Sequence, residues 1–285
     1  IIAVRPLVDG VISDFEVTEE MLLYFMRRAG EFMPKKFLGP RVVVGVPSGV
    51  TNVEVRAVRD ATKNAGAREV YIIEQPMAGA IGIRLPVHDP VGSMIIDIGG
   101  GTTDIAVISL GGIVRSKNLK IAGDKLNNDI ISYIRNEFKI LIGETTAEQV
   151  KIEVGLVIAS EPVETTIRGR DLITGLPREV VITDSDIREA MEQSINSIIE
   201  STKEVLETTP PEILSDIMKR GIHLVGGGAL IQGLDQLFRE TIKIPITIAD
   251  DPLTAVARGA GIILEDLEKF RIVLIESEDD IPSAK

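Results

Sequence analysis

The sequence predicts an α/β protein made of two lobes. In the first third of the chain, short β-branched runs alternate with amphipathic helices, which is the pattern of parallel strands covered by helices. Beyond residue 93, three apolar runs follow one another with only tight turns between them, which is typical of an antiparallel meander. The change of pattern at residues 90–93 indicates the boundary between the lobes.

The elements of the first lobe follow from its periodicity. A helix is predicted over 17–31, because Thr18 can cap it and its apolar residues recur at helical spacing. The valine-rich run 41–46 is typical of a buried strand. The other elements expected here are a helix over 51–65, a strand over 70–74 and a helix over 75–83.

The second lobe is predicted to begin with the meander and to continue with a hairpin over 164–182, where Gly175 and Pro177 mark the turn. The long helix after it has Asp184 or Ser185 as its cap, and Pro210-Pro211 ends it. The remaining predicted elements are strands at 94–98, 105–110, 113–121, 222–225 and 244–248, and helices at 125–138, 146–158, 230–241 and 254–270.

These elements give an expected division of the chain. Residues 1–92 would form what is present of the first lobe, and 93–264 the second lobe, with a smaller subdomain inserted at 124–209. Residues 265–285 would be a C-terminal return followed by an acidic tail. No repeat of fixed period interrupts this order.

Composition and charge exclude several functional classes. The net charge of −12 argues against a nucleic-acid partner, because neutralising phosphates requires a basic surface. The absence of cysteine excludes disulfides, thiol catalysis and thiolate zinc sites, and it fits a reducing cytoplasm. No apolar stretch approaches the ~18 residues that a membrane span requires.

The first glycine-rich turn joins two strands of the meander and reads DIGGGTTD over residues 97–104. Three consecutive glycines allow a tight turn with several N–H groups exposed on one side, which suits a phosphate. Thr102 and Thr103 add hydroxyl donors, and Asp97 can hold a hydrated Mg²⁺. No helix follows, so this is neither a P-loop nor a Rossmann fingerprint. An ordinary tight hairpin is the alternative interpretation.

A second glycine-rich turn, LVGGGAL over residues 224–230, leads from a strand into a predicted helix. The N–H groups and the dipole at a helix N-terminus favour an anion or nucleotide. Close packing of a helix on a strand also requires small residues, so this turn alone is weak evidence. Its presence together with the first turn favours a nucleotide site.

Four motifs in combination resemble the actin and heat-shock chaperone ATPase superfamily. They are the second phosphate loop (97–104), the adenosine motif (224–229), and two connecting helices, IEQPMAGAIG (73–82) and PLTAVARGAG (252–261). Within it the chain is most similar to the MreB-type bacterial actin-like proteins, on RPLVDGVISDF (5–15), IAGD (121–124) and TTPPE (208–212). The resemblance implies an actin-like ATPase fold, with ribonuclease H-like lobes around a nucleotide cleft.

The resemblance also implies ATP or ADP with Mg²⁺ as cofactors, and it assigns their contacts. Asp97 would support Mg²⁺ through water. Without the family, Glu148 and Lys151 would be interpreted as a surface ion pair at helical spacing. The implied contacts are Gly99, Gly100, Gly101, Thr102 and Thr103 with the phosphates, Gly123 and Asp124 with the ribose, Glu148, Gln149 and Lys151 with the adenine, and Gly226, Gly227, Gly228 and Ala229 with the adenosine.

Two departures from the family pattern bear on catalysis. Gln75 stands where the family has the glutamate that orients water, and Glu74 precedes it. A glutamine positions water but cannot accept its proton, so slow hydrolysis is expected, with Thr103 as a second water contact. The Asp-x-Gly-Thr first phosphate loop of the family has no counterpart in this sequence, so we expect a first lobe truncated at its N-terminal part.

Residues 33–39, MPKKFLG, place Phe37 and Leu38 beside two lysines. This arrangement suits an anionic membrane surface, with apolar side chains inserted and lysines on headgroups, and the family has a similar loop here. In the alternative interpretation, the loop folds Phe37 onto the core.

The hypothesis is a cytoplasmic filament subunit, peripheral to the inner membrane, that polymerises with ATP and works with cell-wall elongation proteins to organise cell shape. One alternative is a non-catalytic actin-like fragment, which the absent first loop favours. Another is a small-molecule kinase or chaperone-like ATPase on the same fold, for which no substrate-facing Asp base and no peptide-binding domain can be assigned.

Overall fold

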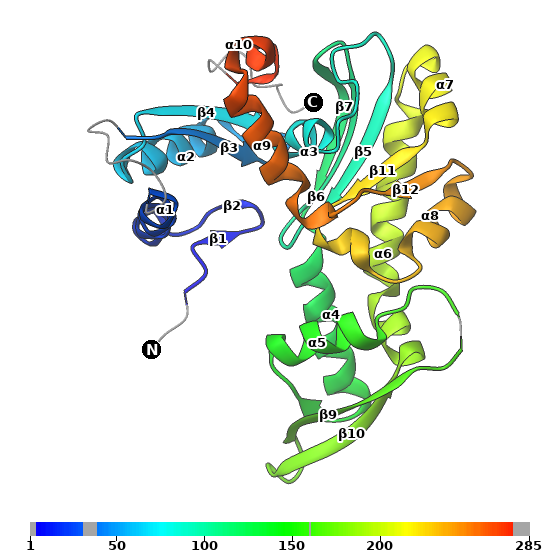
Figure 1. Ribbon diagram of the computed structural model, residues 1–285. Helices are drawn as coiled ribbons and strands as arrows, with labels where there is room; N and C mark the ends of the chain where they lie inside the picture. Colours follow the sequence, from blue (N-terminus) through cyan, green and yellow to red (C-terminus); the bar gives the residue numbers. More distant parts are fainter. Residues whose placement is uncertain (1–3, 31–38, 160, 276–285) are drawn as a thin grey trace.

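A mixed five-stranded sheet forms the centre of the second lobe (Figure 1). The computed structural model describes residues 4–30, 39–159 and 161–275. The three strands that come first in the chain form the predicted antiparallel meander. The two later strands extend the sheet on the other side of the first meander strand and run parallel to it. In spatial order the strands are β12 (Ile246–Ile248), β11 (Ile222–Val225), β5 (Ser93–Ile98), β6 (Thr103–Ser109) and β7 (Gly112–Leu119).

Side chains alternate between the two faces of this sheet. Met94, Ile96 and Ile98 of β5 pack into the core of the second lobe, whereas Ile95 packs with α3 (Gln75–Gly82) on the opposite face. Asp97 lies on the same face as Ile95, and Asp104 is its partner on β6, so both carboxylates point toward the first lobe.

The first lobe contains a parallel pair of strands with two helices, and a separate hairpin near the N-terminus (Figure 1). Asp14, and not the predicted Thr18, caps the first helix, because its Oδ1 accepts the Val17 N–H at 3.1 Å. Thr51 caps the second helix through a capping box with Glu54. The elements are β1 (Leu7–Val8), β2 (Val11–Ile12), α1 (Phe15–Gly30), β3 (Arg41–Val46), α2 (Asn52–Asn64) and β4 (Glu69–Glu74).

Helices α3 and α9 (Ala255–Glu265) pack against each other between the lobes (Figure 1). Their backbones touch at two glycines: a Cβ on Gly82 would lie 1.9 Å from the Ala255 carbonyl oxygen, and one on Gly259 would lie 1.8 Å from that of Ala78. The single helix predicted over 254–270 is broken at Asp266, which caps the short helix α10 (Leu267–Phe270).

The smaller part of the second lobe extends away from the five-stranded sheet (Figure 1). Helix α5 ends at Val154 instead of the predicted residue 158, because Gly155 follows with a different backbone conformation. The elements are α4 (Gly123–Glu137), β8 (Ile140–Leu141), α5 (Glu144–Val154), β9 (Glu164–Asp171), β10 (Pro177–Thr183) and α6 (Asp184–Glu207).

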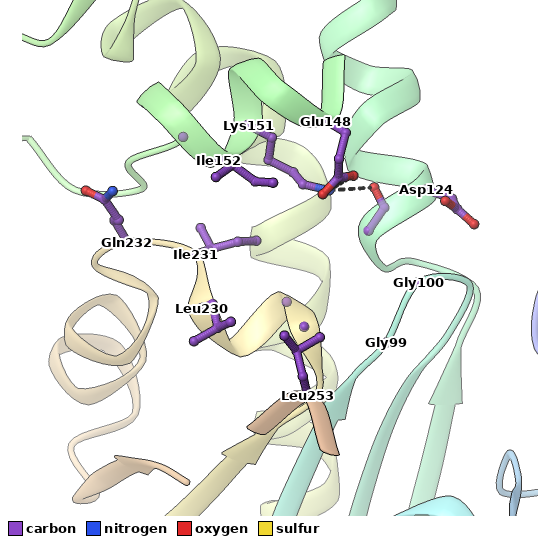
Figure 2. Close-up of a pocket in the computed structure, with 14 residues that line it drawn as sticks. Gly99, Gly100, Asp124, Glu148, Lys151, Ile152, Leu230, Ile231, Gln232 and Leu253 are labelled. Atoms are coloured by element: carbon purple, nitrogen blue, oxygen red, sulfur yellow. Dashed lines mark hydrogen bonds and ion pairs between the residues drawn. The ribbon is translucent and has the colours of Figure 1, made fainter. Parts of the chain in front are cut away.

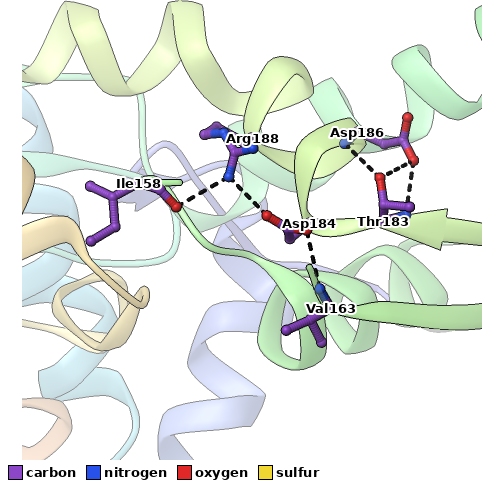
Figure 3. A network of polar contacts seen from close by, with 6 residues as sticks. All are labelled: Ile158, Val163, Thr183, Asp184, Asp186 and Arg188. Carbon is purple, nitrogen blue, oxygen red and sulfur yellow. Dashed lines mark hydrogen bonds and ion pairs between the residues drawn. The ribbon is translucent and has the colours of Figure 1, made fainter. Parts of the chain in front are cut away.

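The start of α6 anchors the segment that leads into β9 (Figure 3). Thr183, one residue before the predicted positions, caps the helix through a capping box with Asp186. Asp184 accepts the Val163 N–H at 3.2 Å and pairs with Arg188 at 2.9 Å. Arg188 also donates to the Ile158 carbonyl oxygen, so Ile158 and Val163 are both tied to the start of α6.

Two helices near the C-terminus differ from the prediction. Helix α6 already ends at Glu207, before the two prolines, and Pro211 instead begins the unpredicted helix α7 (Pro211–Arg220), where its missing N–H costs nothing. Helix α8 (Leu234–Ile242) begins after Gly233, four residues later than predicted. None of the helices in the described ranges is long and apolar enough to cross a membrane. The domain boundaries stay a prediction.

Candidate functional site

A cavity of about 430 Å³ lies where the two glycine-rich turns meet the first turn of α4 and the last turns of α5 (Figure 2). Its lining combines backbone from the glycines with a few charged and apolar side chains. The lining residues are Gly99, Gly100, Gly123, Asp124, Glu148, Lys151, Ile152, Gly155, Gly227, Gly228, Leu230, Ile231, Gln232 and Leu253.

The structure therefore brings together residues that the sequence assigned separately to phosphate, ribose, adenine and adenosine. The apolar wall was missed. Ile152 of α5 faces Leu230 and Leu253 across the cavity, and all three side chains are exposed (Figure 2). Leu230 and Leu253 belong to the quoted motifs, and Ile152 follows Lys151, so only adjacency in the sequence could have found them.

The first glycine-rich turn is a closed hairpin, because Gly99 N–H donates to the Thr102 carbonyl oxygen at 2.9 Å. The carbonyl oxygens of Gly99 and Gly100 accept the N–H groups of Gly123 and Asp124, at 3.1 and 2.8 Å. Within the described ranges, the N–H groups of Gly100 and Gly101 have no hydrogen-bond acceptor. The turn thus directs its carbonyl groups toward α4 and keeps donors for a ligand.

The second glycine-rich turn packs tightly on the end of β5. A Cβ on Gly226 would lie 2.3 Å from the Ile98 carbonyl oxygen, and one on Gly228 would lie 2.2 Å from Ile98 Cγ2. Gly226 also has φ +81°, which favours glycine. The predicted helix N-terminus at this turn is wrong, because Gly227–Leu230 form one 3₁₀ turn. Gly227 and Gly228 line the cavity, whereas Ala229 is fully buried behind it.

Lys151 and Glu148 form a partly buried pair at the cavity wall (Figure 2). Lys151 is only 8% exposed, and its Nζ lies 2.8 Å from Glu148 and 3.3 Å from the Gly123 carbonyl oxygen. Burial opposes the charged form of Glu148, but hydrogen bonds from Lys151 and Asn127 outweigh it and lower the pKa of this carboxyl. A surface ion pair therefore does not describe the site, and Gln149 is exposed outside the cavity.

We expect Lys151→Met to lower the free energy of unfolding by about 1–2 kcal/mol, because Glu148 and the Gly123 carbonyl group lose a buried charged partner. Urea unfolding measures the change. Lys203→Met is the matched control, since it also breaks a Glu–Lys pair of the same i,i+3 spacing, with Glu200, but its lysine is 35% exposed. The control should change stability by less than about 0.5 kcal/mol. Equal effects would contradict the assigned role of burial.

Three carboxyl groups lie behind the first turn. Burial, together with the charge of Asp104, raises the pKa of Asp97 to about 7. Burial also raises the pKa values of Asp104 and Glu74. In the part of the chain that the structure describes, no three histidine, aspartate or glutamate side chains come close enough together to hold a metal ion directly. The single carboxylate of Asp97 fits a hydrated ion held through water.

The residues predicted for hydrolysis lie on different faces of the sheet. Gln75 begins α3 and contacts the first lobe, where a Cβ on Gly45 would lie 3.3 Å from its Cγ. Thr103 points to the opposite face from Asp104, and its hydroxyl donates to the Ile121 carbonyl oxygen at 2.6 Å. Asp104, beside Asp97, was not singled out from the sequence. Phe37 and Leu38 lie outside the described residues.

Comparison with known proteins gives consistent relatives. A family model described as MreB/Mbl protein matches residues 1–272. The cell shape-determining protein Mbl of Bacillus subtilis (strain 168) is 46% identical over 271 residues, covering 95% of this chain and 81% of the relative. The cell shape-determining protein MreB of Escherichia coli (strain K12) is 48% identical over 271 residues, covering 94% and 77%.

Solved structures agree with this result. MreB5 of Spiroplasma citri bound to ADP has a TM-score of 0.87 at 40% identity, over 93% of this chain and 80% of that one. The same protein bound to AMPPNP gives 0.86 at 39% identity over the same shares. The MamK double helical filament gives 0.79 at 24% identity, over 92% and 80%, and shows the fold alone. These similarities confirm the fold class that the sequence predicts.

Proposed function

Because the chain belongs to the MreB/Mbl protein family and has the actin-like fold, we propose that it is an ATP-binding cytoskeletal subunit that forms filaments and helps determine cell shape. One observation carries the proposal: the two glycine-rich turns meet at one cavity, together with the residues assigned to ribose and adenine. The ADP and AMPPNP complexes of MreB5, a protein of the same fold at about 40% identity, support a nucleotide as the ligand.

The cavity suggests a role for each wall. The free N–H groups of Gly100 and Gly101 would hold the phosphates, with Asp97 supporting hydrated Mg²⁺ nearby. The base would lie between Ile152 and the pair Leu230 and Leu253, because apolar side chains on both sides suit a flat ring. The Glu148–Lys151 pair supplies polar groups at the edge of this slot.

Hydrolysis would be slow. Gln75 can orient water but cannot take its proton, and the carboxyl group of Glu74 beside it is half-buried with a raised pKa. Mg²⁺ would neutralise charge on the phosphates when bound. Thr103 would reach the water only if its hydroxyl left the Ile121 carbonyl group.

The proposal places the subunit in the cytoplasm, at the inner face of the membrane, where it would assemble with further copies of itself and with cell-wall elongation proteins. Phe37 and Leu38 would contact the lipid surface, with Lys35 and Lys36 on headgroups. MamK, which shares the fold, is known as a double helical filament.

Titration calorimetry and sedimentation test the proposal in two steps. We expect the chain to bind Mg-ATP with one site and to pellet at high speed only when the nucleotide is present. Binding of Mg-ATP without pelleting, at every protein concentration tested, would contradict filament formation. Absence of binding would remove both parts.

A non-catalytic actin-like structural protein is the second candidate. The hydrogen bond of Thr103 to the Ile121 carbonyl group, on the face away from Gln75, favours it. Release of inorganic phosphate from Mg-ATP distinguishes the two: binding and assembly without phosphate release would support the non-catalytic protein.

A further inference from the structure

The carboxylate of Asp104 receives hydrogen bonds from three separate segments. Its Oδ1 accepts the Ser48 N–H at 2.7 Å and the Asn118 Nδ2 at 3.0 Å, and its Oδ2 accepts the Thr102 hydroxyl at 3.3 Å. Ser48 follows β3 in the first lobe, whereas Asn118 and Thr102 belong to the second. Asp104 is 1% exposed. One buried carboxylate therefore joins the two lobes directly behind the first glycine-rich turn.

The hydrogen bond from the Ser48 N–H to Asp104 is the strong polar link between the lobes at the site. A short N–H bond to a buried carboxylate is charge-assisted and is not screened by water. Within the described ranges, the other polar links beside the site are the ion pairs of Arg5 with Asp124 and Glu144 and of Lys120 with Asp9, whose side chains are well exposed. Exposed pairs contribute little.

The loop of the first lobe at Pro47 and Ser48 also packs against the β1–β2 hairpin. A Cβ on Gly10 would lie 2.6 Å from Pro47 Cγ and 3.1 Å from Thr102 Cγ2. Gly10 of the β1–β2 hairpin thus lies against both the loop at Pro47 and the glycine-rich turn, while Ser48 in the same loop donates to Asp104. A small change in the hydrogen bonds of Asp104 is passed to a packed segment and not absorbed by solvent.

Thr102 gives this contact a way to respond to a ligand. Its hydroxyl has one proton, so it donates either to Asp104 or to a phosphate oxygen at the turn. A bound phosphate that accepts this proton changes the hydrogen bonds of Asp104, and the Ser48 N–H is the donor that leads to the other lobe.

We propose that Asp104 is a positioning residue that couples phosphate binding at the first glycine-rich turn to the placement of the first lobe through the Ser48 N–H. The proposal rests on the proposed nucleotide site. It does not require Asp104 to touch the nucleotide or the reacting water.

Ser48→Pro breaks the link from the first-lobe side. Ser48 and Gly49 form a turn in which Gly49 has φ +75°, and proline is favoured before such a glycine in a type II turn. Proline removes the N–H and its ring displaces the carboxylate. Ser48→Ala is the matched control, because it keeps the N–H and removes only the hydroxyl. This hydroxyl lies near Asp104 and Glu74 and partly offsets the burial that raises their pKa values, but it makes no well-aligned hydrogen bond among the described residues.

Two further variants act on the carboxylate itself. Asp104→Ala removes the acceptor. Asn118→Ala is its control, because it removes another bond to the same oxygen but only within the second lobe. The chain contains no cysteine, so Val53→Cys in α2 and Ile173→Cys in the β9–β10 turn, 78% and 81% exposed, accept a pair of fluorophores cleanly. Energy transfer between them reports the distance between the lobes.

We expect Mg-ATP to change the transfer efficiency in the parent, in Ser48→Ala and in Asn118→Ala. Ser48→Pro and Asp104→Ala should still bind Mg-ATP in calorimetry but lose this change. In Asp104→Ala the Ser48 amide should also exchange its hydrogen roughly 10- to 100-fold faster than in the parent.

Two results overturn the inference. One is a parent-like transfer response in either loss variant. The other is equal Ser48 amide exchange in the parent and Asp104→Ala, which needs no nucleotide. Absence of Mg-ATP binding to the parent overturns the proposed function instead, and it leaves the amide-exchange result to decide whether the link exists. If Asp104→Ala does not fold, Ser48→Pro and Ser48→Ala decide the coupling.

Discussion

Gly259→Ala is expected to lower the free energy of unfolding by about 3 kcal/mol, the upper part of the range for overpacking a close contact. The new methyl group would lie 1.8 Å from the Ala78 carbonyl oxygen and 2.6 Å from its carbon. These are backbone atoms of α3, so no rotamer change relieves the clash and the two helices must separate. For a chain of this size the melting temperature should fall by roughly 6–10 °C, measured by calorimetric or circular-dichroism melting.

Gly261→Ala, two residues further along α9, provides the control. Among the residues that the structure describes, a Cβ there meets no heavy atom within 4 Å, so the substitution tests helix propensity alone. Alanine is favoured over glycine in a helix interior by about 0.5–1 kcal/mol, so this variant should be slightly more stable than the parent. The two substitutions thus have opposite expected signs. Equal behaviour would show that α3 and α9 do not touch at Gly259.

The sequence predicted much of this fold because its signals are local. The β3 run and the three meander strands carry enough β-branched residues, bounded by glycine or proline, to identify them without tertiary information. Helix boundaries were harder to predict, since Asp14 and Thr18 are both acceptable caps for the first helix and only the structure shows that Asp14 accepts the Val17 N–H.

Ligand access, the reason that the sequence suggested for the glycines in the two turns, explains only part of their role. In the first turn, none of the three glycines has positive φ, but a Cβ on Gly101 would lie 3.1 Å from the Gly10 nitrogen, which is a tight contact with backbone. In the second, Gly226 and Gly228 allow contact with Ile98, so close packing and ligand access act together. Such contacts join residues more than 90 positions apart in sequence, and no local pattern reveals them.

Asp104 shows the same limit for the site. In the sequence it only ends a motif, and Thr103 was the residue assigned to the phosphates and the water. Strand alternation separates the two: Thr103 faces Ile121, and Asp104 faces the first lobe. The register of β6 had to be known before the faces could be assigned. Eight residues that line the cavity are among those that the family resemblance implies, whereas the apolar side chains of Ile152, Leu230 and Leu253 were missed.

Gly100→Ala is expected to leave stability unchanged and to weaken Mg-ATP binding by about 10- to 100-fold, or roughly 1.4–2.7 kcal/mol. A Cβ at this position meets no heavy atom of the described residues within 4 Å, and Gly100 has no positive φ, so the fold accepts alanine. The methyl group would instead stand at the cavity wall beside the free N–H groups, and it would keep phosphate oxygens from reaching them.

Calorimetric titration of the parent, Gly100→Ala and Gly261→Ala separates this effect from a general one. Gly261→Ala makes the same chemical change in equally open space but away from the cavity, so its affinity should equal that of the parent. Parent-like affinity in Gly100→Ala would mean that the phosphates do not approach this turn. An equal loss in both variants would show that the effect is not specific to the first glycine-rich turn. A loss confined to Gly100→Ala, with an unchanged melting temperature, would locate the phosphates at the turn between β5 and β6.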